Sequence, residues 1–190
     1  MPRPQLWVLA GGNGAGKTTF YAQFLEPQGV VFVNADRIAH QLYSDNSVDL
    51  SYAAAKIAAR IRDQLLRDKQ SFCFETVFSH PSKIDFIAKA KAAGYDIVLV
   101  FIHLDHVALN KARVLQRVSE GGHDVPKNKI ASRIPRTLGH IKSALPLCDR
   151  VELIDNSSYV NPMQRVATLR NGHTTLHVDP LPDWAAKLIE

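Results

Sequence analysis

The stretch "GGNGAGKT", residues 11–18, contains the residue types that hold phosphate groups. It follows a short apolar run, "QLWVLA" (5–10), and opens a segment of helical character, "KTTFYAQFL". Glycines let backbone N–H groups turn toward phosphate oxygens, and the N-terminus of the following helix favours negative charge. In this pattern Lys17 bridges the β- and γ-phosphates of a nucleoside triphosphate, and the Thr18 hydroxyl holds Mg²⁺. The predicted nucleotide-binding residues are Gly11, Gly12, Asn13, Gly14, Ala15, Gly16, Lys17, Thr18 and Thr19.

A second apolar run, "VFVN" (31–34), is followed closely by Asp36. Ligands of open parallel sheets bind beyond the carboxyl ends of the strands, where both the glycine loop and Asp36 are expected. A carboxylate at that place can accept the proton of a hydroxyl that attacks the γ-phosphate. Asp36 is therefore predicted to be a general base that also binds the substrate. The alternative is a helix cap for "RIAHQLY", and Arg37 is expected to be a surface or structural residue.

A third apolar run, "SFCFE" (71–75), brings Glu75 and Thr76 to the same edge. Two roles for Glu75 remain open: it holds Mg²⁺ through bound water, or it accepts a hydrogen bond from the substrate. Thr76 is predicted to bind the substrate.

Positive charge is concentrated in one segment of the chain. Residues 110–142 contain eight Lys or Arg against two acidic residues, so they account for all of the net charge of +5. Arginines recur at helical spacing (113 and 117, then 133 and 136), and "EGGHDVP" with its two glycines lies between them. This pattern predicts a helical lid over about 106–145, in which Arg117, Arg133 and Arg136 neutralise the transferring phosphoryl group. The alternative is a solvated helical face.

Apolar runs alternate with helical segments along the chain, which predicts an α/β fold with a mainly parallel sheet of about five strands, covered by helices on both faces. The longest run, "YDIVLVFIHL" (95–104), is expected at or near the centre. Asn171-Gly172 predicts the turn of a C-terminal β-hairpin, followed by a short helix, over about 164–190. Further helices are expected at 48–69, 81–94, 106–119 and 127–145, and a fifth strand at 150–156. The 190 residues fit a single domain.

The composition excludes several classes of protein. Hydrophobic residues make up 46% of the chain and charged residues 22%, a profile typical of globular proteins, and no run is long enough to span a bilayer. Cys73 and Cys148 are too few for a disulfide framework, which with the absence of a signal peptide predicts a cytoplasmic protein. A local basic segment, rather than a basic surface, argues against nucleic acid as a partner.

Four stretches in this order, "AGGNGAGKTT", "NADRIA", "FETVFSH" and "RVSEGGHDVP…SRIPRT", resemble the zeta-toxin family of P-loop kinases, especially its shorter members. The resemblance covers about residues 5–156 and implies a three-layer P-loop kinase fold. It also implies ATP as co-substrate, Mg²⁺ as cofactor and an antitoxin protein as partner.

The best-known members of that family phosphorylate the amino-sugar of UDP-N-acetylglucosamine. The resemblance also makes Asp36 the general base and Arg117 a lid arginine that contacts phosphates. The longer toxins place a second lid arginine near the position of His123, so the resemblance implies that His123 binds the substrate and that Arg133 or Arg136 takes the role of that arginine. Two alternatives remain: a kinase for another acceptor (a metabolite, an antibiotic or a nucleic-acid end), and a nucleotide-dependent switch ATPase in which Asp36 is only a cap.

Overall fold

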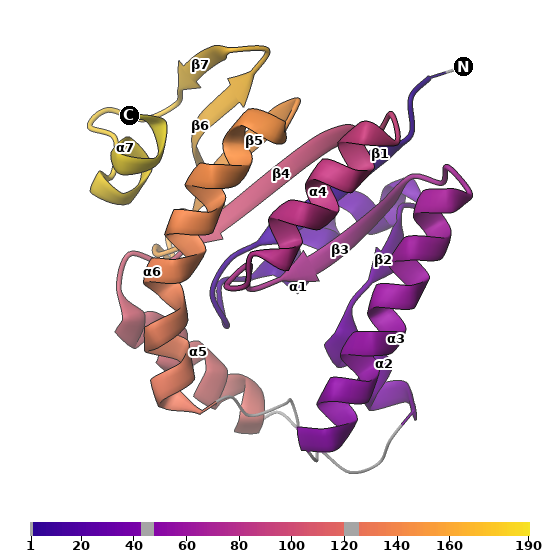
Figure 1. Cartoon of the computed structure of the whole chain (residues 1–190). Helices are drawn as coiled ribbons and strands as arrows, with labels where there is room; N and C mark the ends of the chain where they lie inside the picture. The colour runs from indigo at the N-terminus through magenta and orange to yellow at the C-terminus, as the bar shows by residue number, and fades with distance from the viewer. Residues whose placement is uncertain (1, 43–47, 120–125) are drawn as a thin grey trace.

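A computed structural model describes residues 2–42, 48–119 and 126–190 of the chain. Its strands form one sheet in the order β2-β3-β1-β4-β5-β6-β7 (Figure 1). The strands are β1 Gln5–Ala10, β2 Val31–Val33, β3 Phe72–Thr76, β4 Asp96–His103, β5 Arg150–Asp155, β6 Gln164–Arg170 and β7 His173–Leu176. The helices are α1 Lys17–Phe20, α2 Ala35–Leu42, α3 Val48–Arg67, α4 Ser82–Ala92, α5 Val107–Ser119, α6 Lys127–Ala144 and α7 Asp183–Ile189. A π-helical stretch, η1 Tyr21–Leu25, continues α1, and short 3₁₀ segments are η2 Glu26–Gln28 and η3 Leu145–Leu147.

The first five strands pair in parallel, as the sequence predicts. The longest apolar run forms β4, which occupies the middle of the sheet and is buried along almost its whole length. The predicted hairpin is also confirmed: Asn171 and Gly172 both have positive φ (52° and 77°), and β6 pairs antiparallel with β7 across this turn. On its other side β6 pairs antiparallel with β5. The hairpin therefore extends the same sheet to seven strands.

Two hydrophobic cores lie on the two faces of the sheet. One face is packed against α3, α4, α6 and α7, which lie in front of the sheet in Figure 1. The other face is packed against residues of α1, η1 and α5, among them Tyr21 and Leu25. This arrangement confirms a three-layer α/β fold, and it brings the carboxyl ends of β1, β2 and β3 to one edge.

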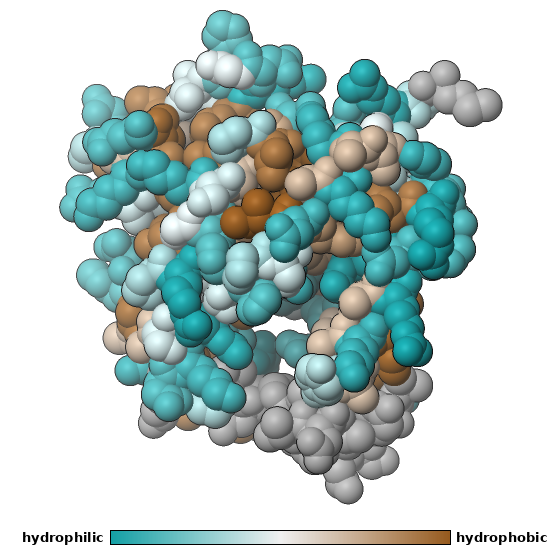
Figure 2. Space-filling view, in the orientation of Figure 1, coloured by the Kyte–Doolittle hydropathy of each residue, from teal (hydrophilic) through white to brown (hydrophobic). Residues whose placement is uncertain are grey.

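The predicted lid segment forms the helices α5 and α6, which pack together through Val114, Val118 and Ile130. The space-filling view shows the surface hollowed between α6 and the side formed by α2 and α3 (Figure 2). Within the described residues, no helix is both long and apolar enough to span a bilayer.

Candidate active site

The loop between β1 and α1 has a backbone that few residues other than glycine adopt. Gly16 has φ +101°, and a Cβ atom at that residue would lie 2.7 Å from the amide nitrogen of Asn156. At Gly11 a Cβ atom would lie 2.2 Å from the carbonyl oxygen of Ile102. Larger residues would therefore displace the loop from β4 and from the segment after β5, so the glycines are needed to hold the loop against the sheet.

Lys17 is buried at the start of α1, with 5% of the residue exposed. Its ammonium group donates to the carbonyl oxygens of Gly11 (3.0 Å) and Gly12 (2.9 Å) and lies 3.6 Å from the Glu75 carboxylate. Burial lowers the pKa of Lys17, and the carboxylates of Glu75 and Asp36 partly offset this effect. The lysine is thus a buried cation beside the phosphate-binding loop.

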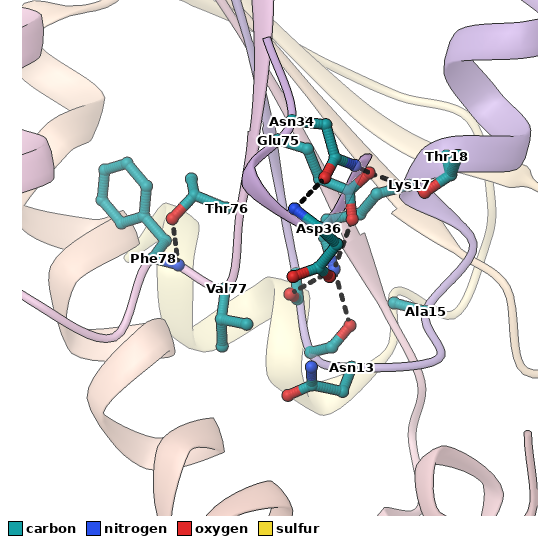
Figure 3. A network of polar contacts seen from close by, with 12 residues as sticks. Asn13, Ala15, Lys17, Thr18, Asn34, Asp36, Glu75, Thr76, Val77 and Phe78 are labelled. Atoms are coloured by element: carbon teal, nitrogen blue, oxygen red, sulfur yellow. Dashed lines mark hydrogen bonds and ion pairs between the residues drawn. The ribbon is translucent and has the colours of Figure 1, made fainter. Parts of the chain in front are cut away.

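Glu75, at the end of β3, connects three elements of the site (Figure 3). Its Oε2 atom accepts hydrogen bonds from the Thr18 hydroxyl (2.6 Å) and from the Asn34 side-chain amide (2.9 Å), while Oε1 faces Lys17. Because both carboxylate oxygens face the loop and β2, Glu75 lies on the nucleotide side of the site. The sequence left two roles open for Glu75. This geometry favours holding Mg²⁺ through bound water over accepting a hydrogen bond from the substrate.

Asp36 lies in the first turn of α2, beyond the end of β2, and its residue is exposed. The cap of α2 is Asn34, whose side-chain oxygen accepts hydrogen bonds from the backbone N–H groups of Asp36 (2.8 Å) and Arg37 (3.2 Å). The alternative in which Asp36 caps the helix is therefore wrong. Asp36 is close enough to Lys17 to raise its pKa, and its side chain lies beside the same polar cluster in Figure 3. The Asp36 carboxylate therefore does not cap α2, and it faces the site.

Two asparagines that were not predicted to be site residues bond the loop from outside, and an arginine in turn bonds one of them. The Asn110 amide donates to the carbonyl oxygen of Asn13 (2.8 Å), and the Asn156 amide donates to that of Ala15 (2.8 Å). Arg113 donates to the carbonyl oxygen of Asn156 (2.9 Å) and lies over the exposed Tyr159 ring, 5.3 Å from its centroid. Asn156 directly follows β5, so its place after a parallel strand is the only signal in the sequence that points to it.

The lid arginines differ in how they relate to the loop. Arg117 lies close enough to Lys17 to lower the pKa of that lysine, and Arg133 donates to the side-chain oxygen of Asn13 at 3.5 Å. Arg136 is exposed and bonds the carbonyl oxygen of Ser132 in its own helix. The structure therefore brings Arg117 and Arg133 to the phosphate-binding loop and leaves Arg136 on the surface of α6.

Thr76, another residue predicted to bind the substrate, is not brought to Lys17. Successive side chains of a strand point to opposite faces, so Thr76 points away from Glu75, and its hydroxyl accepts a hydrogen bond from the backbone N–H of Phe78 (3.0 Å) (Figure 3). His123 lies outside the described residues. Arg37 has its guanidinium over the rings of Tyr21 and Phe32, a structural position, as expected.

A Mg²⁺ ion prefers oxygen ligands and usually retains several waters while it binds one or two protein oxygens and substrate phosphates. The Thr18 hydroxyl and the Glu75 carboxylate, 2.6 Å apart next to the loop, fit that requirement. No group of three or more His, Cys, Asp or Glu residues that could hold a metal by themselves occurs in the described part of the chain. The residues present therefore suit a metal that arrives with a nucleotide.

Known proteins resemble this chain in sequence and in fold. Residues 1–164 match the family model described as zeta toxin. An uncharacterized protein of Haemophilus influenzae is 28% identical over 140 residues, which cover 70% of this chain and 99% of that protein.

Two solved structures share the fold at low sequence identity. The complex AvrRxo1-ORF1:-ORF2 with ATP has a TM-score of 0.76 and 19% identity, over 99% of this chain and 64% of that one. The PezAT chromosomal toxin-antitoxin system of Streptococcus pneumoniae has a TM-score of 0.70 and 20% identity, over 95% of this chain and 78% of that one. This chain thus spans less than two thirds of the AvrRxo1 chain, and these two likenesses show the fold alone.

Proposed function

Because the chain belongs to the zeta-toxin family, we propose that it is a kinase that transfers the γ-phosphoryl group of ATP to a hydroxyl group of a small molecule. The observation that carries this proposal is the contact of Glu75 with both Thr18 and Asn34, since it joins the phosphate-binding loop to the strand and helix that present Asp36. A switch ATPase with no acceptor does not require a carboxylate next to this junction.

In this reaction the acceptor oxygen attacks the γ-phosphorus while the bond from that phosphorus to the β–γ bridging oxygen breaks and ADP leaves. Asp36 takes the proton of the acceptor hydroxyl. Lys17, Arg117 and Arg133 offset the negative charge of the phosphates. Thr18 would hold Mg²⁺ directly and Glu75 would hold it through bound water, and the ion would supply further neutralisation of the phosphate charge.

UDP-N-acetylglucosamine is the first acceptor to test, on the grounds of family membership. Thr76, Arg136 and His123 remain predicted contributors to substrate binding or catalysis. An antitoxin protein as partner is a further part of the proposal, and PezAT, a structure of similar fold, is a toxin-antitoxin system. We also place the protein in the cytoplasm, where ATP and nucleotide sugars are available.

The test is an incubation of the purified protein with Mg²⁺, γ-labelled ATP and UDP-N-acetylglucosamine, with mass analysis of the products. We expect a phosphorylated nucleotide sugar, and we expect Asp36→Asn to lower its rate of formation by roughly 10²-fold or more while the affinity for ATP stays the same. Near-normal transfer by Asp36→Asn would refute the base assignment. ATP hydrolysis with no acceptor product, in a cell extract as well, would favour the switch ATPase.

A further inference from the structure

The strand β7 ends the sheet with an open edge. It pairs with β6 on one side, and no described strand pairs with its other side (Figure 1). All residues of β7 are exposed, including the apolar Leu176, whose exposed fraction is 55%. A free strand edge presents unpaired N–H and C=O groups, which proteins commonly protect with lysine, proline or a bulge. β7 contains no lysine and no proline, and its pairing with β6 is regular.

The opposite edge of the sheet, formed by β2, is better protected. Val33 is buried, and the Arg37 guanidinium lies over the Phe32 ring, 5.2 Å from its centroid. The helix α2 follows this strand closely, and α3 contacts it. The two edges therefore differ, and only the one at β7 is left accessible along its length.

The backbone groups that β7 presents to the open side can be assigned from its pairing. Residues of an antiparallel strand alternate between turning their N–H and C=O groups toward the partner and turning them away from it. His177, two residues after Thr175, donates its N–H to the carbonyl oxygen of Val166 in β6 (2.9 Å). Thr174 and Leu176 are therefore the residues whose backbone groups point outward, and an added strand would pair with them.

One face of β7 is apolar. Thr174 and Leu176 lie opposite Leu169 and Ala167 of β6, which belong to the face that carries the larger core and α7. The Leu176 side chain extends this face to the open edge, where it remains in contact with water. An apolar side chain from an added strand would cover it.

The other face of the hairpin is polar and basic. The Thr168 hydroxyl donates to the Glu152 carboxylate (2.8 Å) and lies 2.9 Å from Nε2 of His177, so these three side chains share that face. Glu152 is almost completely buried, because Arg150 and Arg165 both pair with it, at 2.8 and 2.9 Å. Its charge is thus fully used by two arginines.

The same face holds a third arginine beside the edge strand. Arg170 lies opposite both Arg150 in β5 and His173 in β7, and Arg170 and His173 are exposed. The strands β6 and β7 contain no acidic residue. The acidic residues that follow, Asp179 and Asp183, lie in a segment that packs on the apolar face. Three arginines therefore share this face with one carboxylate, which leaves an excess of positive charge.

We propose that β7 is a docking edge for an extended segment of a partner protein in which acidic and apolar residues alternate. On such a segment the acidic side chains would lie beside Arg170 and the histidines, and the apolar ones would cover Leu176. A second copy of this chain suits the edge less well, since each copy has a net charge of +5 and the two basic faces would adjoin. Three strands separate β7 from β1 and its phosphate-binding loop, so this proposal does not depend on the kinase function.

The probe for this edge is a synthetic seven-residue peptide that alternates glutamate with valine and carries a fluorophore. Anisotropy at about 0.15 M salt, where exposed charges are partly screened, measures its dissociation constant. Hydrogen exchange locates it. We expect saturable binding that slows the exchange of the Thr174 and Leu176 amides. A peptide with lysine in place of glutamate should not bind, and one in which the glutamates are grouped together should bind roughly 10-fold more weakly.

Strand pairing itself is tested on the peptide, so the protein stays unchanged. In an antiparallel addition the residues opposite Thr174 and Leu176 are the valines, and their N–H groups face β7. Methylation of the valine amides should therefore abolish binding, whereas methylation of the glutamate amides should leave it unchanged. The reverse result would also place a strand on β7, in the parallel direction. An equal effect of the two methylations would refute strand pairing.

Variants of the protein test the two faces and the edge. Thr174→Pro removes one outward N–H and should weaken binding roughly 10-fold, and Arg170→Gln should weaken it roughly 5-fold. Arg60→Gln, which removes the same charge from the exposed side of α3, should leave it unchanged. The proposal is overturned if binding never saturates, or if Thr174→Pro and Arg170→Gln bind as the wild type does. A wild-type dimer in sedimentation that Thr174→Pro makes monomeric would show that a second copy, rather than an acidic partner, occupies the edge.

Discussion

At the scale of single residues, Asn34 combines a structural role with a role in the site. Its side-chain oxygen caps α2, and its side-chain nitrogen donates to Glu75. The orientation of Asp36 and that of Glu75 therefore depend on one side chain, which explains why an amide, with one acceptor and two donor hydrogens, occupies this position. A carboxylate there could cap the helix and would repel Glu75.

We therefore expect Asn34→Ala to lower the free energy of unfolding by about 1–2 kcal/mol, because the cap is lost. Asn34→Ser should recover most of that stability, since serine also caps helices, while it cannot reach Glu75 as the amide does. Chemical denaturation measures the first effect and phosphoryl transfer the second. If Asn34→Ser restored both stability and transfer in full, the bond to Glu75 would have no part in activity.

At the scale of elements, Asp149, the residue before β5, connects α4 to the sheet. Its carboxylate accepts a hydrogen bond from the backbone N–H of Ile97 (2.8 Å) and pairs with Lys91 of α4. Burial opposes the charged form, but the bonds from Lys91 and Ile97 outweigh it and lower the pKa of Asp149 below 3.8. The folded-state pKa is therefore below the unfolded one. The carboxylate stabilises the fold fully above about pH 4, and this contribution is lost as the pH falls through the folded-state value.

Asp149→Asn should accordingly lower the free energy of unfolding by about 1 kcal/mol at pH 7, a modest value because the pair is partly exposed to solvent. The difference from the wild type should shrink as the pH falls below 4. Urea denaturation at pH 7 and pH 3 measures both. Asp63→Asn, which breaks an exposed pair with Lys89, provides a comparison that we expect to show a smaller difference at pH 7. A difference for Asp149→Asn that did not change with pH would contradict the role of its charge.

The elements were predictable from the sequence to a greater degree than their side-chain contacts. Apolar runs such as "YDIVLVFIHL" and the Asn171-Gly172 turn determine strands through local patterning, and all of them are found in the structure. Glu75 and Thr76 were predicted to reach the same site because both lie at the end of one strand. Neighbouring side chains of a strand point to opposite faces, so this alternation predicts that Thr76 points away from Glu75.

Contacts between distant segments leave no local pattern in the sequence. Asn156 and Asn110 bond the nucleotide loop from 141 and 97 residues away, respectively. The position of Arg62 over two phenylalanine rings likewise depends on three elements that meet only in the folded chain. Motif spacing identified the loop and the neighbouring carboxylates, whereas the residues that hold them in place required the three-dimensional structure.

At the scale of the whole molecule, nucleotide binding should stabilise the fold, because the phosphate-binding loop connects β1 to α1 and both pack into the core. With Mg²⁺ and ATP at 100 times the dissociation constant, we expect about 2.7 kcal/mol of added stability, measured as a rise in Tm. The rise should be smaller in excess EDTA and absent in Lys17→Met. An equal rise in Lys17→Met would mean that ATP stabilises the protein from another site.

The match to the zeta-toxin family ends at residue 164, yet the segment after it belongs to the same core. Trp184 of α7 is 6% exposed and packs edge-on against Phe101 of the central strand, with 5.7 Å between ring centroids. Trp184→Ala should therefore cost about 3–5 kcal/mol of stability, as expected for a large aromatic side chain removed from a core.

The indole N–H is buried without a hydrogen-bond partner in the described structure, so Trp184→Phe removes an unsatisfied donor along with some volume. It should remain within about 1.5 kcal/mol of the wild type. If denaturation showed that both variants were as stable as the wild type, α7 would be an appendage, and the fold would depend only on the segment that the family shares.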